Sequence, residues 1–385
     1  MTKGNFPVDK LKGIDTPFYY YDIDLLKRTL KIVKEETKKY GFNQHYAVKA
    51  NANRRILELI ASEGFGADCV SGNEVKAAVN AGFPASKIVF AGVGKTDKEI
   101  NMALDLNIFC FNVESLPELE VINELANKKG KLAQVALRIN PDVDAHTHEY
   151  ITTGLNENKF GFSMAHLENV VEKLKALKSI KLIGLHFHIG SQIEDVHTFE
   201  PLCERVNELQ DTFEKMDIKL EHINLGGGLG IDYENPDANP VPDFAAYFEL
   251  FAKYLKLRDN QLVHFELGRA IVGQCGALVT RTVYVKHGES KTFVIVDAGM
   301  TDLIRPALYQ AYHKVENISS DQPAEKYDVV GPICESSDVF VKDYELNGTS
   351  RGDLLVLRSA GAYGEIMASQ YNCRELPKAY YSDKI

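Results

Sequence analysis

Short apolar runs alternate with longer amphipathic segments over most of the chain. Between residues 44 and 268 we find eight β-rich runs, separated by segments with helical patterns. They cover residues 45–49, 66–70, 87–92, 108–113, 134–140, 182–190, 222–228 and 262–268. Strands that alternate with helices pair in parallel, because the chain must cross back over the sheet after each strand. Eight such units predict a closed (β/α)8 barrel of the TIM type.

Helix-start signals follow several of these runs. A Ser or Thr three residues before a Glu is typical of a capping box, and three such pairs stand just after predicted strands. They are Ser71/Glu74, Thr96/Glu99 and Ser115/Glu118. The segment 197–216 carries apolar residues at helical spacing, which predicts an amphipathic helix packed on the barrel.

The pattern changes after Gly268. Alternating strand-like segments without intervening helices follow at 277–286, 291–297, 326–331 and 353–359. We therefore expect a C-terminal β-sandwich or β-barrel domain at 269–385, after a barrel domain at 31–268. Residues 1–30 contain the strand-like run TPFYYYD and are expected to join the β-domain, while 234–243 reads as an exposed loop before a helix.

Composition narrows the class of protein. The chain has 385 residues, 45% of them hydrophobic, and a formal net charge of -10, which argues against nucleic acid or an anionic membrane as the main partner. The six cysteines show neither metal-ligand nor disulfide spacing, so we expect no metal site and a reducing compartment. The amino terminus has no apolar signal core and no run is long enough to span a membrane, which favours a cytoplasmic protein.

Polar side chains collect where the predicted barrel strands end, the place where such barrels carry their chemistry. Lys49 ends the first strand, and its amine could pair with a carboxylate or, if desolvated, form a Schiff base with an aldehyde. Glu266 could pair with Arg269 or hold a cofactor's pyridine nitrogen in its protonated form. The other candidates at strand ends are Asp68, Arg138, Asn140, His186, His188 and the glycines Gly226, Gly227 and Gly228, which could cradle a phosphate or form a tight turn.

The β-domain adds three clusters. Arg305 and Tyr309 are one helical turn apart, and Cys334 adjoins Glu335 in a turn-rich loop. Cys334 could be reactive or simply structural. Tyr363 follows a predicted strand among small residues, an arrangement suited to an anion or to a close-packed corner.

Taken together, these segments resemble the diaminopimelate decarboxylases, which are fold-type-III pyridoxal-phosphate enzymes related to alanine racemase. YAVKAN resembles the Schiff-base lysine motif, which implies that role for Lys49. LHFHIGSQ resembles the motif of a histidine stacked on the pyridine ring, here His188, with Ser191 near the phosphate. INLGGGLG resembles the phosphate loop, and FELGR the segment that supplies Glu266, Gly268 and Arg269. We count Asp68 among the residues that bind the cofactor.

The resemblance continues into the β-domain. GPICESSD resembles a cysteine-acid motif that the family places in the partner subunit, so Cys334 would be the proton donor and Glu335 a substrate contact. LIRPALY implies that Arg305 and Tyr309 bind the distal carboxylate, with Arg269 also contacting the substrate. AGAYG implies that Tyr363 contacts phosphate and substrate. The expected assembly is a homodimer with shared active sites.

The implied reaction is the pyridoxal-phosphate-dependent conversion of meso-diaminopimelate to L-lysine and CO2, the last step of lysine biosynthesis. Carboxynorspermidine, ornithine and arginine decarboxylases of the same fold are the alternatives, but they would not need two arginines at the distal end of the substrate. A catalytically silent regulatory binding homologue is an alternative of another class. Two departures from the family pattern stand out: Leu267 replaces the usual proline, and the carboxyl terminus is short.

Overall fold

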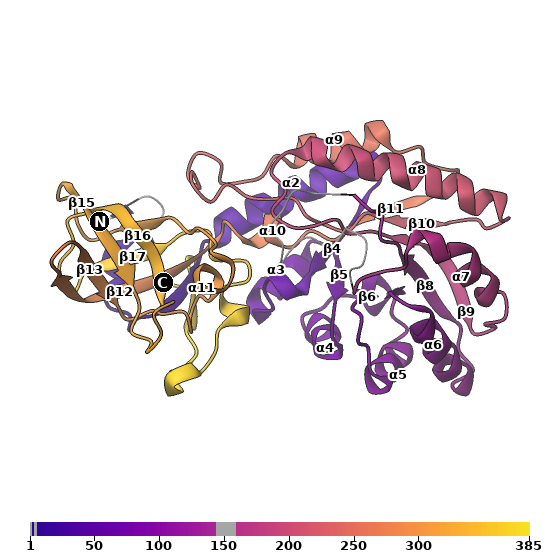
Figure 1. Ribbon diagram of the computed structural model, residues 1–385, viewed down its shortest axis with the longest axis horizontal. Coiled ribbons are helices and arrows are strands. Elements are labelled where there is room, and N and C mark those ends of the chain that lie inside the picture. Colours follow the sequence, from indigo (N-terminus) through magenta and orange to yellow (C-terminus); the bar gives the residue numbers. More distant parts are fainter. Residues whose placement is uncertain (1, 4–5, 144–158) are drawn as a thin grey trace. The chain divides into compact units, whose positions relative to one another are not determined.

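The structure, a computed structural model, describes residues 2–3, 6–143 and 159–385. The chain forms two compact units. The barrel unit contains Leu30–Gly230 and Asp243–Gly268. The β unit contains Met1–Thr29, Ile231–Pro242 and Arg269–Ile385, so both chain ends belong to it (Figure 1). The segment 231–242, most of it in the predicted loop, therefore groups with the β unit rather than with the barrel.

The barrel unit confirms the predicted eight-stranded parallel barrel. Its strands are β4 (Asn43–Ala47), β5 (Gly66–Cys69), β6 (Ile88–Phe90), β7 (Cys110–Val113), β8 (Ala133–Arg138), β9 (Ile180–His186), β10 (His222–Asn224) and β11 (Leu262–Phe265). They close in the order β4 to β11, with β11 pairing in parallel with β4. The helices of this unit are α2 (Ile23–Tyr40, which begins in the β unit), α3 (Arg54–Ser62), α4 (Gly72–Asn80), α5 (Asp97–Leu106), α6 (Leu116–Lys128), α7 (Leu167–Leu174), α8 (Glu200–Lys215) and α9 (Phe244–Tyr254). They lie outside the strands in Figure 1.

The helix starts follow the capping signals in the sequence. Thr96 and Glu99 form a complete capping box at the start of α5. Ser71 and Ser115 also cap α4 and α6 through their hydroxyl groups. The glutamates of these two pairs accept instead from the backbone of the residue before the cap, Val70 for Glu74 and Glu114 for Glu118. Three helices are thereby fixed at the ends of their strands.

The amphipathic stripe in 197–216 belongs to α8, where it is packed as predicted. Its buried residues are Leu202, Cys203, Val206, Leu209, Gln210 and Phe213. An aromatic cluster on the neighbouring helix α9 continues this core, with Tyr247 and Phe251 in edge contact with Phe265 of β11. Burying rings of this size is a large hydrophobic contribution, so the helices are held firmly against the barrel wall.

The strands end earlier than the sequence suggested. β4 stops at Ala47, and Lys49 lies in a short 3-10 helix, Val48–Ala50. His188 lies two residues beyond β9, and Glu266 one residue beyond β11. The prediction that these residues close their strands was therefore wrong by one or two positions, because the backbone turns out of the ladder towards the following helix. They still stand at the carboxyl-terminal mouth of the barrel, where such enzymes bind ligands.

The β unit is a mostly antiparallel sheet, which confirms the predicted β-domain after the barrel. Its strands are β1 (Thr2–Lys3), β2 (Phe6–Pro7), β3 (Phe18–Tyr21), β12 (Gly276–His287), β13 (Thr292–Val296), β14 (Val315–Asn317), β15 (Ala324–Val330), β16 (Val339–Asn347), β17 (Leu354–Leu357) and β18 (Lys378–Tyr381), with short helices α1 (Val8–Leu11), α10 (Arg269–Val272) and α11 (Arg305–Tyr309). The long strand β12 pairs with β3 and β17 along its first half and with β13 along its second. The amino-terminal strand β3 is thus built into this sheet, and β18 pairs with its other side. In the ranges that the structure describes, no helix has the length and apolarity needed to cross a bilayer.

Three histidines form a hydrogen-bonded chain inside the barrel unit, near the amino-terminal ends of the strands. Nε2 of His45 lies 2.9 Å from Nδ1 of His264, whose Nε2 lies 2.9 Å from Nδ1 of His222. The ring of Phe109 packs against all three. Burial lowers the pKa of each imidazole, and for His264 the neighbouring histidines lower the pKa further. The folded protein therefore favours the neutral form of all three imidazoles.

This cluster predicts acid sensitivity of the barrel unit. The unfolded histidines have a pKa of about 6.5, above their folded values, so the unfolded state binds more protons as the pH falls. The contribution of the three histidines to the free energy of unfolding is complete above about pH 6.5 and is lost as the pH falls below it. We expect the midpoint temperature of thermal unfolding, measured by calorimetry, to fall as the pH is lowered from about 7.5 to about 5. The His264→Gln variant should show a weaker dependence on pH. Replacing the exposed His287 by Gln should not weaken it. An equal slope in His264→Gln and wild type would contradict the assignment.

Candidate active site

A buried carboxylate, Glu266, is the centre of a polar network in the barrel mouth. Its Oε1 accepts from Nδ2 of Asn112 at 3.0 Å and from Nδ2 of Asn224 at 2.6 Å, while Oε2 lies 2.8 Å from Nε2 of His186. Burial alone would raise the pKa of Glu266, but the charges and hydrogen bond around it, those of His186 first, bring this pKa far below its usual range. Glu266 is therefore an anion held rigidly by three other strands.

Lys49 and Asp68 lie in the same mouth. Nζ of Lys49 is 3.9 Å from Oδ2 of Asp68, whose side chain is only 1% exposed. Burial, and then the charge of Glu266, raise the pKa of Asp68 well above its ordinary value, so Asp68 favours its protonated form beside the ionised Glu266. Oδ1 of Asp68 is buried without a hydrogen-bond partner in the described part of the chain. A buried polar atom without a partner at this place fits a site that binds a polar ligand.

The glycine run Gly226–Gly228 follows β10, where neighbouring backbone segments come so close that a side chain would not fit. A side-chain carbon at Gly226, which has a φ of +67°, would lie 2.3 Å from the carbonyl oxygen of Phe187, and one at Gly227 would lie 2.3 Å from that of Glu266. The Gly226 amide already donates to Oδ1 of Asn224 at 2.9 Å, and the Gly227 amide points at Nδ1 of His188 at 3.4 Å. The run therefore joins neighbouring strand ends as well as offering backbone to a ligand.

His188 is held in its neutral form. Burial comes first among the causes that lower its pKa far below the usual value, followed by the positive charges of Lys49 and Arg138. Ser191 follows it in the loop between β9 and α8. Gly268 ends the barrel unit, where a side-chain carbon would lie 2.9 Å from that of Ala50. The barrel unit thus brings Lys49 and Asp68 together and surrounds Glu266 with polar partners.

In the β unit, two buried arginines meet at one phenol. Nη1 of Arg269 donates to the hydroxyl of Tyr233 at 2.6 Å, and Nη1 of Arg305 donates to the same oxygen at 2.9 Å. Burial alone would raise the pKa of Tyr233, but the two guanidinium groups lower it overall. The ring of Tyr363 lies under Arg269, with 4.9 Å between guanidinium carbon and ring centre. This cluster is a site for an anionic oxygen.

Arg305 is positioned by a second partner. Its Nη1 also lies 2.9 Å from Nε2 of His313, whose Nδ1 is 2.9 Å from the carbonyl oxygen of Arg358 and therefore carries the proton. Burial, and then the charge of Arg305, lower the pKa of His313 to about 3, so its Nε2 remains an acceptor. Tyr309 is at the end of α11, which starts at Arg305, as the one-turn spacing predicted.

Cys334 and Glu335 lie on a different loop of the β unit, and both are exposed. Asp338 fixes this loop by accepting from the backbone of Ile333 at 2.7 Å and of Met300 at 2.6 Å. The hydroxyl of Tyr371 donates to Oε1 of Glu335 at 2.9 Å. Among the described residues of the β unit, no hydrogen bond joins this loop to the arginine pair.

Three of these residues, Tyr233, Asn112 and Asn224, were not selected from the sequence, and His186 was selected without a role. Tyr233 lies next to a segment that reads as an exposed loop, and no local signal marks it. Asn112, His186 and Asn224 are on three separate strands, and only their common contact with Glu266 shows their role. An asparagine or histidine inside an otherwise apolar strand was the available signal, since buried polar groups need partners.

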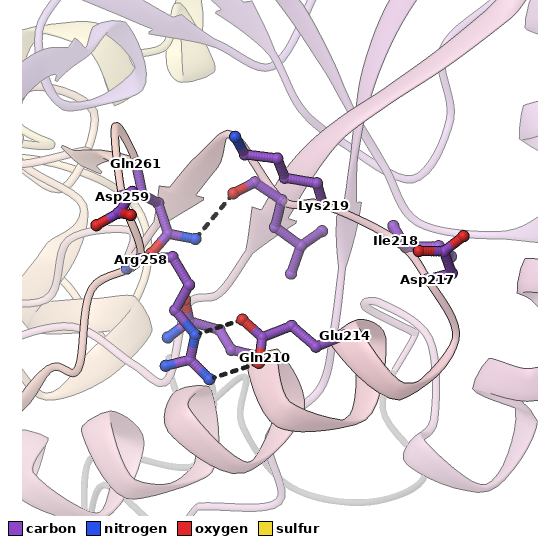
Figure 2. A pocket seen from close by; sticks show the side chains of 9 residues that line it. Gln210, Glu214, Asp217, Ile218, Lys219, Arg258, Asp259 and Gln261 are labelled. Atoms are coloured by element: carbon purple, nitrogen blue, oxygen red, sulfur yellow. Dashed lines mark hydrogen bonds and ion pairs between the residues drawn. The ribbon is translucent and has the colours of Figure 1, made fainter.

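A separate hollow near the end of α8 in the barrel unit offers no comparable chemistry. Figure 2 shows Arg258 paired with Glu214, with 2.8 Å between Nε and Oε1. Gln261 donates to the carbonyl oxygen of Leu220 at 2.9 Å. The other residues that line this hollow are Gln210, Asp217, Ile218, Lys219 and Asp259. These contacts connect α8 to the loop before β11, which is a structural role.

Comparison with known proteins agrees with this geometry. The family model for the pyridoxal binding domain of pyridoxal-dependent decarboxylases matches residues 24–273. A diaminopimelate decarboxylase of Bacteroides thetaiotaomicron is 64% identical over 384 residues, which is 100% of each chain. The chain belongs to the diaminopimelate decarboxylases. The family predicted from the sequence is thus confirmed.

More distant diaminopimelate decarboxylases agree in sequence and in fold. The enzyme of Neisseria meningitidis serogroup A is 45% identical and aligns with 94% of this chain and 88% of its own. A crystal structure of the Helicobacter pylori diaminopimelate decarboxylase complexed with L-lysine matches with a TM-score of 0.91 and 40% identity, covering 98% of this chain and 94% of that one. Full-length agreement confirms the predicted pairing of a barrel with a β-domain.

Proposed function

We propose that this protein decarboxylates meso-diaminopimelate to L-lysine and CO2, with pyridoxal phosphate as its cofactor. The observation that carries the proposal is the 64% identity over the whole chain to a diaminopimelate decarboxylase. The buried Glu266 anion, the lysine beside Asp68 and the arginine pair give the proposal a chemical basis. Comparing CO2 release from diaminopimelate, lysine, ornithine and carboxynorspermidine tests it against the related decarboxylases.

The barrel mouth fits the cofactor. Lys49 would attach the cofactor through its amine, and the Glu266 anion would keep the pyridine nitrogen protonated. Neutral His188 would lie against the ring, and Asp68, whose Oδ1 is buried and unpaired, would add a polar contact. The phosphate would be held by Ser191, Gly226, Gly227, Gly228 and Gly268, together with Arg269 and Tyr363. Bound pyridoxal phosphate supplies an electron sink for the electron pair left when CO2 departs.

The β unit supplies recognition of the substrate. Arg305 and Tyr309 would bind the distal carboxylate of diaminopimelate, Glu335 its distal ammonium group, and Arg269 and Tyr363 would complete the contacts. In the free protein, the hydroxyl of Tyr233 accepts from both guanidinium groups and so holds them next to each other. Ornithine and lysine have no distal carboxylate, so they would leave the buried Arg305 cation without an anionic partner, a costly arrangement that selects against them.

We further propose that the protein is a cytoplasmic homodimer with two composite active sites. Cys334 holds the proton that returns to the α-carbon after CO2 leaves, and it acts on substrate bound in the barrel of the other subunit. Support comes from the family resemblance of the CESSD loop. The six unpaired cysteines suit a reducing compartment.

Replacing Arg305 by alanine should raise KM for diaminopimelate by roughly 10- to 150-fold, because a charge-assisted hydrogen bond of about 1.5–3 kcal/mol is lost. Bound cofactor, followed by its visible absorbance, should be retained. Steady-state kinetics with the exposed Arg351→Ala as a matched control will separate this effect from a general loss of positive charge. If KM is unchanged, or if the cofactor is lost instead, Arg305 does not bind the distal carboxylate.

A further inference from the structure

Two of the six cysteines differ from the rest. Cys69, Cys110, Cys203 and Cys275 are buried, whereas Cys334 and Cys373 are exposed. Both exposed thiols belong to the β unit, and they lie far apart in the sequence. Cys334 is the proton donor in the function proposed above, while no role has been given to Cys373. Exposed thiols are the ones that exchange with disulfides, because buried ones are inaccessible and stay protonated.

Two hydrogen bonds tie the segments that carry these thiols. The Cys334 amide donates to Oδ1 of Asn372, the residue before Cys373, at 3.2 Å. The Tyr371 hydroxyl donates to Oε1 of Glu335, the residue after Cys334, at 2.9 Å. Adjacent Cα atoms are about 3.8 Å apart, so Cys373 is one peptide unit from a side chain in contact with Cys334. The two cysteines are therefore neighbours in space.

The backbone at Cys373 is also unusual. Asn372 and Cys373 have φ angles of 55° and 57°, a left-handed conformation that costs energy in residues with side chains. Residues 371–373 are exposed, so this turn is not locked by packing. A disulfide needs Cα atoms about 4.4–6.8 Å apart, a separation that the turn can reach by closing on the loop to which it is already bonded.

We propose that Cys334 and Cys373 form a reversible disulfide within one chain, which switches the enzyme off by consuming its proton donor. The oxidant is a low-molecular-weight disulfide such as glutathione disulfide. The Cys373 thiolate attacks one sulfur of this disulfide and releases one glutathione thiolate. The Cys334 thiolate then attacks the Cys373 sulfur and releases the second. The protein thiols lose two protons and two electrons, and the glutathione disulfide is reduced to two glutathione molecules.

The test begins with the holoenzyme treated with glutathione disulfide, freed of reagent and measured as intact mass. Wild type should lose two hydrogen atoms and carry no adduct, and after digestion its Cys334 and Cys373 peptides should be linked. Cys373→Ser should instead carry a glutathione adduct, and Cys334→Ser/Cys373→Ser should not react. A stable adduct on wild type, or a link between two chains on a non-reducing gel, would overturn the proposal.

Activity gives the second readout. Oxidised wild type should lose activity by about 100-fold or more, the range for removing a proton donor, and dithiothreitol should restore it. Cys373→Ser in reducing buffer should be as active as wild type. This inference rests on the proposed function for its effect on activity, and the two fail differently. Reduced wild type without decarboxylase activity contradicts the function, whereas cross-linked protein with full activity overturns the switch.

Discussion

Replacing Lys49 by alanine is expected to reduce decarboxylation by roughly 10²–10⁴-fold or more, because no other amine among the described residues stands beside Asp68 in the barrel mouth. The variant should also lose the visible absorbance band of the bound cofactor. Lys49 is partly exposed and pairs with Asp68 only at 3.9 Å, so its removal should leave the fold intact. Absorbance spectra and initial rates on purified protein measure both effects.

The exposed Lys38 on α2 provides the matched control for this variant. Lys38→Ala removes the same side chain from the same unit and should keep the wild-type spectrum and rate. Far-ultraviolet circular dichroism should be the same for all three proteins. A Lys49→Ala protein that retains cofactor absorbance and turnover would show that another group attaches the cofactor.

Mixing two inactive variants is expected to restore activity if the active site is shared. Lys49→Ala and Cys334→Ala chains, unfolded and refolded together in equal amounts, should form heterodimers as about half of the dimers. Each heterodimer has one site with both residues intact and one with neither, so about a quarter of wild-type activity should return. Native mass spectrometry gives the heterodimer fraction and a decarboxylation assay the recovery.

A second mixture controls for refolding. Lys49 and Glu266 belong to the same barrel mouth, so Lys49→Ala with Glu266→Gln leaves every site defective, and no activity should return. Background activity in the first mixture, with heterodimers present, would contradict the composite site. Recovery in both mixtures would mean that refolding, rather than complementation, restores activity.

The sequence predicted the barrel because its determinants are local. Apolar runs, capping residues and the change of period after Gly268 each act over a few residues, and all eight strands and the caps of Thr96, Ser71 and Ser115 appear in the structure. The predicted ends of the strands were less accurate. Lys49 lies in a 3-10 helix, because the backbone leaves the ladder after Ala47, and side-chain pattern alone does not register that turn.

The candidate site was predictable where motifs carry it, and less so where contacts are long-range. Glu266 was selected, but the amide and imidazole groups that hold it come from β7, β9 and β10 and meet only in the closed barrel. Tyr233 was missed since its contacts with Arg269 and Arg305 depend on a segment that groups with the β unit. Cys373 was visible only as one of six cysteines.

Product analysis decides the substrate. Purified protein with added pyridoxal phosphate and meso-diaminopimelate should release CO2 and form L-lysine in equal amounts, and it should release far less CO2 from ornithine, lysine or carboxynorspermidine. Chiral amino-acid analysis and CO2 detection on the same samples measure both products. Absence of L-lysine, or faster CO2 release from one of the other three amines, would contradict the assignment of this chain as a diaminopimelate decarboxylase.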